Sequence, residues 1–152
     1  MPYRPNYPAS VSEVLDPSMK FRPGVLAAVK RFKAAKPYRG SLDERKLKFQ
    51  SLHRDLCALF SKTTTLTFGT LDGSDSGSSS YCPGTDTITL KGKLSVVTYL
   101  HEFAHALGRD ERGACKWSVN LFKRTFPVLF SRCQHDGHTL RRPAAPGSSE
   151  GA

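Results

Sequence analysis

The sequence predicts one α+β domain, in which a small mixed sheet of about three strands packs on helices. Three observations predict this fold class. Apolar residues recur at helical spacing in several long segments, and they alternate with polar residues in shorter, threonine-rich segments. No internal repeat interrupts this order, and a chain of 152 residues fits a single domain. We therefore expect one hydrophobic core.

The composition divides the chain into an arm, a domain and a tail. Residues 1–20 are rich in proline and lack periodicity, which predicts an extended N-terminal arm. Residues 21–140 are expected to form the domain, with a basic helical part at 21–60 and a part at 61–127 that holds the chemistry-bearing residues. Residues 141–152 are rich in proline, glycine and serine, which predicts a disordered tail.

The basic part is expected to contain two helices. Pro23 precedes an apolar stripe over residues 25–32, and Pro37 ends that helix. The motif Ser41-Leu-Asp-Glu44 is a capping box, in which the serine hydroxyl and the glutamate carboxylate satisfy free amides of the first turn. The helix that it starts has one apolar face, made of Phe49, Leu52, Leu56, Leu59 and Phe60.

The strand patterns come next. Residues 63–71 are rich in threonine, with apolar residues alternating, which is typical of a half-buried strand. Residues 72–80 have the composition of a flexible loop. Residues 81–90 are predicted to form a hairpin that turns at Pro83 and Gly84.

Two further helices are expected after the hairpin. The first ends at Gly108, and its apolar stripe consists of Val97, Leu100, Ala104 and Leu107. The second begins near Asp110 and ends at Pro127. Its inner face consists of Ala114, Trp117, Ser118, Leu121 and Phe122.

The stretch HEFAHALGRDE, residues 101–111, carries the candidate site. Positions four apart lie roughly 40° apart around a helix, so His101 and His105 project side by side. Their imidazole nitrogens can converge on one ion at the ~2.0–2.1 Å that zinc prefers. Glu102 lies about 60° from His105 on the same side, where it can touch a water on the metal. The alternative is a chance match, with the histidines only pairing with nearby carboxylates.

The HExxH pattern predicts a hydrolase that holds one zinc ion. Zinc lowers the pKa of its water toward ~7, Glu102 takes the proton, and the hydroxide attacks a carbonyl that the metal polarises. The apolar stripe fixes the opposite side of the helix in the core, so the histidines face a cleft. The leading hypothesis is therefore a zinc-dependent metallopeptidase that acts on a protein or peptide.

A hydrolytic zinc site needs a third protein ligand and one open position. Glu111 stands six residues beyond His105, and Gly108 between them can break the helix and turn the chain back. A glutamate in the first turn of a helix is also favoured by the helix dipole, so a structural role stays open. The alternative ligands are Asp110, which we expect as the N-cap residue, His135 and His138. Cys133 with those two histidines would form a second metal site.

The segment from Tyr81 to Phe126 resembles a minimal gluzincin-type zinc metallopeptidase, similar to ImmA/IrrE-type peptidases and minigluzincins. The resemblance rests on the strand DTITL, on YLHEFAHALG and on DERGACKWSVNLF, which matches the family pattern at Glu111, Ala114, Trp117, Ser118 and Leu121. It implies a zincin-like fold with Glu111 as the third zinc ligand and Glu102 as the general base. It also implies an edge strand before the metal helix, which binds an extended peptide by strand addition through Thr87, Ile88 and Thr89.

Two features depart from that pattern. The gap between His105 and Glu111 is shorter than in gluzincins and has the metzincin spacing, yet no methionine follows the motif to form a Met-turn. SprT-type, DNA-linked proteases are a second comparison because of the basic segment, but no zinc ribbon follows here.

Hydrolysis also needs a hydrogen-bond donor for the developing oxyanion. Tyr99 lies about 200° from His101 around the helix and therefore points away from the metal. The donors that stay open are Tyr81, His135 and His138. Thr98 is expected either behind His101 as a hydrogen-bonding partner or exposed. Trp117 is expected in the core, with a substrate platform as the alternative, and Cys115 is expected as a buried thiol, with a position near the site as the alternative.

The net charge of +10 is concentrated in one segment. Between Lys20 and Arg54 the eleven lysines and arginines face only Asp43 and Glu44, a local balance of +9. Such a segment attracts nucleic acid or an acidic partner through salt-sensitive steering, unless it is only a solvated helical face. The second hypothesis is therefore a nucleic-acid-associated or regulatory zinc protein with little or no peptidase activity.

The sequence also indicates an intracellular, cytoplasmic location without membrane attachment. The N-terminus lacks the apolar region of a secretion signal, and the longest apolar run, residues 25–29, is far shorter than a membrane span. The four cysteines are scattered, which is typical of reduced thiols rather than of a disulfide framework.

Overall fold

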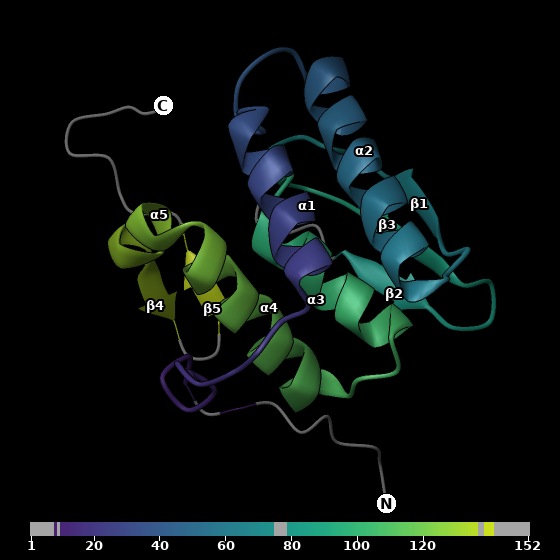
Figure 1. Cartoon of the computed structure of the whole chain (residues 1–152). Coiled ribbons are helices and arrows are strands. Elements are labelled where there is room, and N and C mark those ends of the chain that lie inside the picture. The colour runs from purple at the N-terminus through teal and green to yellow at the C-terminus, as the bar shows by residue number, and fades with distance from the viewer. Residues whose placement is uncertain (1–7, 9, 75–78, 137–138, 142–152) are drawn as a thin grey trace, which may run out of the picture.

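The structure is a computed structural model that describes residue 8 and residues 10–74, 79–136 and 139–141. As the sequence predicts, it combines helices with a small three-stranded sheet. The helices are α1 (Pro23–Ala34), α2 (Leu42–Phe60), α3 (Val96–Ala106), α4 (Glu111–Thr125) and α5 (Pro127–Arg132). The strands of this sheet are β1 (Thr65–Phe68), β2 (Ser80–Cys82) and β3 (Thr87–Leu90), and a separate antiparallel pair consists of β4 (Gln134–Asp136) and β5 (Thr139–Arg141). In Figure 1 the sheet lies on one side of the molecule, and α5 with β4 and β5 lies on the other.

The two predicted basic helices are confirmed, and they pack side by side (Figure 1). The capping box at the start of α2 is present. The backbone N–H of Ser41 donates to Glu44 Oε1 at 2.7 Å, and the N–H of Glu44 donates to Ser41 Oγ at 3.1 Å. The apolar faces meet where Phe32 of α1 contacts Phe49 of α2 edge to face, with ring centroids 4.9 Å apart. Local capping and apolar spacing together therefore account for this pair.

β3 is the central strand of the sheet, so the predicted edge position of this strand is wrong. It pairs in parallel with β1 and antiparallel with β2. Protein backbone therefore occupies both edges of Thr87, Ile88 and Thr89, and these residues cannot accept an added peptide strand. The physical reason is burial, because Ile88 and Leu90 are fully buried and a strand on each side removes their backbone from water. The edge strand that contacts α3 is β2.

The turn from α3 to α4 follows the predicted stop and start signals. Ser95 caps α3 by accepting a hydrogen bond from the backbone N–H of Thr98 at 3.4 Å. Gly108, just past the end of α3, has a φ of +93°, a conformation that favours glycine. Asp110 then caps α4, because its Oδ1 accepts from the backbone N–H of Gly113 at 2.8 Å. The chain thus reverses within a few residues.

The buried side of α3 contains a polar network that the sequence analysis did not predict. Nε2 of His53 lies 2.7 Å from the carbonyl oxygen of Thr64, which can only accept, so Nε2 carries the hydrogen. Nδ1 of His53 therefore accepts from the hydroxyl of Tyr99 at 2.7 Å. Tyr99 is fully buried, and the network joins α2, α3 and the residue before β1.

Residues 10–20 are not the extended arm that the sequence predicts. They form a succession of backbone turns, including the bond from the N–H of Val14 to the carbonyl of Val11 at 3.1 Å. Val11 and Val14 are both buried against the core. Pro17 disfavours a regular helix here, but the valines still gain from burial, and the segment therefore packs onto the domain.

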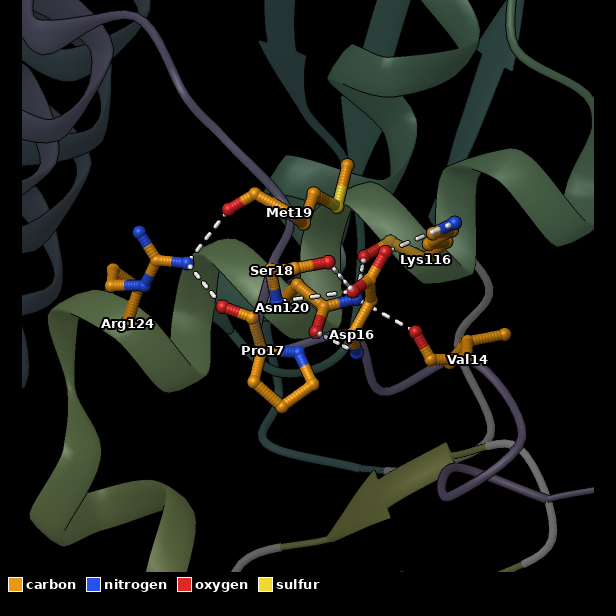
Figure 2. Close-up of polar contacts among 8 residues, drawn as sticks. All are labelled: Val14, Asp16, Pro17, Ser18, Met19, Lys116, Asn120 and Arg124. Atoms are coloured by element: carbon orange, nitrogen blue, oxygen red, sulfur yellow. Dashed lines mark hydrogen bonds and ion pairs between the residues drawn. The ribbon is translucent and has the colours of Figure 1, made fainter.

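A polar row on α4 holds this N-terminal segment in place. Its members recur every four residues and are Arg112, Lys116, Asn120 and Arg124. Figure 2 shows Asn120 at the centre, where Oδ1 accepts from the N–H of Asp16 at 2.8 Å and Nδ2 donates to the carbonyl of Val14 at 2.8 Å. Arg124 donates to the carbonyl of Met19 at 2.7 Å, and Arg112 pairs with Glu13 at 2.7 Å. The segment thus follows most of the length of α4.

The remaining features concern the C-terminal region and the thiols. α5 and the β4–β5 pair were not predicted, and Arg141 of the predicted tail is the last residue of β5. Residues 142–152, the rest of that tail, lie outside the described residues. Along the described ranges, no helix has both the length and the apolarity that crossing a membrane requires. All four cysteines are free thiols, as the sequence predicts.

Candidate metal centre

Two histidines and a glutamate converge where α3 meets α4. Oε1 of Glu111 lies 2.7 Å from Nε2 of His105, and its Oε2 lies 3.3 Å from Nε2 of His101. The imidazole rings have centroids 4.8 Å apart and stand at 81° to each other. Each of the three side chains is about one fifth exposed. The residues predicted as metal ligands therefore meet at one point with access to solvent.

The local backbone explains why Glu111 reaches the two histidines. The histidines lie one turn apart on α3, so they face the same direction. Gly108 reverses the chain directly after this helix, and Asp110 starts the next one. Glu111 is the first residue of α4, and at this position its side chain contacts the last turns of α3.

The hydrogen bonds of His105 determine what the site can hold. Its Nδ1 lies 2.8 Å from the carbonyl oxygen of Arg109, so Nδ1 carries the hydrogen. In the neutral ring, Nε2 then has a lone pair that faces Oε1 of Glu111 at 2.7 Å. Two acceptors at this distance require a proton or a cation between them. Two imidazole nitrogens and a carboxylate are a ligand set that fits zinc.

Cys115 adds a thiol to this cluster. Together with His101 and Glu111 it forms a group whose ligand atoms all lie within 4.8 Å of one another, and this group could hold a metal ion. The Cys115 sulfur lies 3.8 Å from Nδ1 of His101, whereas Glu111 contacts Nε2 of the same ring. Burial raises the pKa of Cys115 to about 11, and the Glu111 carboxylate adds to this effect. The sequence predicts a buried thiol at Cys115, with a position near the site as the alternative, and in the structure Cys115 is both buried and next to His101.

Glu102 lies in the same cleft, as predicted, but it is mostly buried, with an exposed fraction of 8%. Burial raises the pKa of Glu102 to about 7, while His105 opposes the increase and Glu111 adds to it. The backbone N–H of Tyr81 donates to the Glu102 carboxylate and lowers its pKa. Glu102 is therefore fixed between α3 and the edge strand β2, beside the histidines and not between them.

A cleft of about 940 Å³ opens over these residues. Its other walls come from β2, α3, α4 and β5, and they include Ser80, Tyr81, Val97, Thr98, Val119 and Leu140. The hydroxyl of Tyr81 donates to Oδ1 of Asp86 at 2.7 Å, and this bond raises the pKa of Tyr81 to about 12. The Tyr81 hydroxyl, one of the predicted oxyanion donors, is thus bound to Asp86, whereas Thr98 lines the cleft.

The other candidate residues are separate from the centre or lie outside the described side chains. Asp110 uses its carboxylate as the helix cap. Tyr99 and Trp117 are in the core, where the Trp117 ring is stacked on Phe103 with centroids 6.2 Å apart. The side chain of His135 and the whole of His138 fall outside the described part, and with them the second metal site with Cys133.

Comparison of the chain with protein-family models, with curated proteins and with solved structures gives no match. The residues of the cleft and their geometry are therefore the basis for inferring a function.

Proposed function

We propose that this protein is a zinc-dependent metallopeptidase that hydrolyses peptide bonds in the cleft above α3. The observation that supports this most strongly is the convergence of His101, His105 and Glu111 on one point beside the buried Glu102. Three protein ligands leave a zinc ion with an open position, which is the arrangement of hydrolytic sites. Zinc supplies Lewis acidity there, which polarises a carbonyl group and makes water more acidic.

Glu102 is the proton carrier in this proposal. Its carboxylate accepts a proton from the attacking water and transfers it to the amine that leaves. One contact and the burial of the side chain support this role. The Tyr81 N–H orients the carboxylate, and burial excludes most of the bulk water that would otherwise compete for the proton. The carbonyl of Arg109 has a supporting role, because it orients the ring of His105.

We expect the peptide substrate to bind along β2. This edge strand takes the role that the sequence predicted for Thr87, Ile88 and Thr89 of β3. β2 is an edge strand, and its Ser80 and Tyr81 line the cleft. An extended peptide can extend a sheet at such an edge through backbone hydrogen bonds. Val97, Val119 and Leu140 then provide apolar contacts for substrate side chains.

Metal analysis combined with a cleavage assay tests the proposal. The purified wild type is expected to contain one zinc ion, whereas His101→Ala and Glu111→Ala lose it. Glu102→Gln keeps the metal and loses peptide cleavage by about a hundredfold or more, because only the proton carrier is removed. Asp110→Asn is the matched control, since it keeps a helix cap and should keep both zinc and activity. Full zinc content in Glu111→Ala would contradict the ligand assignment, and unchanged cleavage in Glu102→Gln would contradict the reaction.

The second candidate function is a nucleic-acid-associated or regulatory zinc protein. It is favoured by the exposed cations of the segment from Lys20 to Arg54, which include Lys30, Lys33 and Arg39. A salt-dependent affinity for DNA that is unchanged in Glu102→Gln, without any peptide cleavage by the wild type, would support this function over the peptidase.

A further inference from the structure

A second cavity lies between the turn after α1 and the junction of α4 and α5. Its volume is about 260 Å³, and it shares no lining residue with the metal cleft. Its apolar wall consists of Pro37, Tyr38, Phe126, Val128 and Leu129. Its polar rim consists of Lys33, Lys36 and Arg39. The cavity therefore combines an apolar wall with a rim of basic side chains.

The wall formed by the turn after α1 is rigid. The ammonium group of Lys48 donates to the carbonyls of Lys36 and Arg39, both at 2.9 Å. The guanidinium of Arg45 donates to the carbonyl of Pro37 at 3.0 Å. Side chains of α2 thus tie down three of the four residues from 36 to 39, so the cavity is preformed and binding would not need to order this turn.

No described neighbour pairs with the charges at the rim. Lys33, Lys36 and Arg39 are exposed, and within the described ranges none of them forms an ion pair. The ammonium group of Lys33 lies 5.6 Å from the ring centroid of Phe126, so charge and apolar surface are directly adjacent. Val128 is 60% exposed at the same cavity. A complementary ligand must therefore combine negative charge with apolar volume.

We propose that this cavity is a docking site for an acidic peptide segment of a partner protein. One bulky apolar side chain of that segment enters the cavity, and neighbouring carboxylates pair with Lys33, Lys36 and Arg39. The volume supports a single side chain, because pockets for whole small molecules usually measure about 300–1,000 Å³. Buried apolar anchors surrounded by charge pairs are the usual source of affinity and of steering in such contacts. The inference is independent of the chemistry in the metal cleft.

Fluorescence anisotropy on the full chain tests the docking site. The probe is a fluorescein-labelled peptide with one phenylalanine between aspartates and glutamates, and the matched peptide has alanine in place of the phenylalanine. We expect the phenylalanine peptide to bind about tenfold more tightly, with an affinity that decreases as salt is added. Mass spectrometry after the titration verifies that the peptide is intact.

Paired variants separate the cavity from general basic charge. Lys33→Glu and Val128→Asp are expected to weaken binding of the phenylalanine peptide about tenfold. Two control variants lie outside the cavity. Lys30→Glu reverses a charge on the same helix, and Leu47→Asp replaces another exposed apolar residue. Both should change the affinity less than about twofold. Equal binding of the two peptides, or no binding of either, would overturn the proposal. So would tighter binding of oligothymidine that Val128→Asp leaves unchanged, since the surface would then serve nucleic acid.

Discussion

His101 presents its two ring nitrogens to different neighbours, and this arrangement bears on the role of Cys115. Nε2 faces Glu111, the side from which the two histidines would hold an ion, whereas Nδ1 lies 3.8 Å from the Cys115 sulfur. From this position we expect the thiol to support the orientation of the ring. If it served instead as a fourth protein ligand, the open position of a hydrolytic site would be lost.

The first prediction concerns Cys115→Ser. This variant is expected to keep one zinc ion, with an affinity weaker by about tenfold to a hundredfold, because in this proposal the residue supports a ligand instead of binding the metal. Cobalt-substituted wild type should show no sulfur-to-cobalt charge-transfer band in its near-ultraviolet spectrum. A strong band that disappears in Cys115→Ser would instead identify the thiol as a ligand and the site as closed.

His53 is a buried histidine whose surroundings determine its protonation. Burial lowers the pKa of His53, while its bond to the Thr64 carbonyl and the charge of Asp86 act in the opposite direction. The neutral ring satisfies both partners, since Nε2 donates to Thr64 and Nδ1 accepts from Tyr99. Protonation would place a hydrogen on Nδ1 as well, so the Tyr99 hydroxyl could no longer donate to this nitrogen.

The second prediction follows from that lowered pKa. The unfolded chain takes up a proton on His53 near its ordinary pKa of ~6.5, but the folded protein resists protonation to lower pH. The contribution of His53 to stability is therefore complete above about pH 6.5 and decreases as the pH falls through the folded pKa. Urea unfolding between pH 8 and pH 5 should show this decrease in the wild type and a flatter profile in His53→Gln. Parallel profiles would contradict the assignment of a neutral buried ring.

At the scale of elements, the turn between α3 and α4 holds the centre together. α3 provides His101, His105 and Glu102, the proposed ligands and proton carrier, and α4 provides Glu111 at its first residue. The relative position of the two helices therefore sets the distance from Glu111 to the histidines. The N-terminal segment helps to hold α4 in position, because it binds the row from Arg112 to Arg124 along this helix.

The third prediction tests this turn through Gly108→Ala. The φ of +93° strains any residue with a Cβ, although a Cβ at this position would meet nothing within 4 Å. The cost is therefore backbone strain of about 1–2 kcal/mol in the free energy of unfolding, together with weaker zinc binding as Glu111 shifts. Gly84→Ala is the matched control, since a Cβ there is equally free of neighbours and no positive φ is required. Chemical denaturation of both variants measures the difference, and equal losses would rule out strain as the cause.

At the scale of the whole molecule, the metal should join segments that are separate in the sequence. The proposed ligands come from α3 and α4. The N-terminal segment also packs on α4, and α4 leads into α5. A metal ion that binds the folded chain but not the unfolded chain therefore stabilises the entire domain and not only the cleft.

The fourth prediction is a zinc-dependent increase in thermal stability. Free zinc at a hundred times its dissociation constant should add about 2.7 kcal/mol to the free energy of unfolding. Thermal unfolding, followed by circular dichroism, should show a higher midpoint with zinc and reversal by a chelator. His105→Ala should show no zinc-dependent increase, and an increase equal to that of the wild type would indicate that the stabilising ion binds elsewhere.

Much of the fold was predictable because its signals are local. The capping box at Ser41, the stop at Gly108 and the cap at Asp110 each depend on a few neighbouring residues, and all are confirmed. Helix geometry places the two histidines side by side, and the chain reversal at one glycine brings Glu111 back to them. The predicted zinc ion and peptidase activity remain predictions for the experiments above.

Local spacing was sufficient to identify the helices α1 to α4, the hairpin and the group of His101, His105 and Glu111, because each depends on residues close together in the chain. Contacts between distant segments settled the rest. β1 pairs with β3 and makes it central, residues 10–20 dock on α4, and His53 meets Tyr99 from another helix. Such pairings compete with many alternatives of similar local preference, and only the shared burial of all segments in one core selects among them.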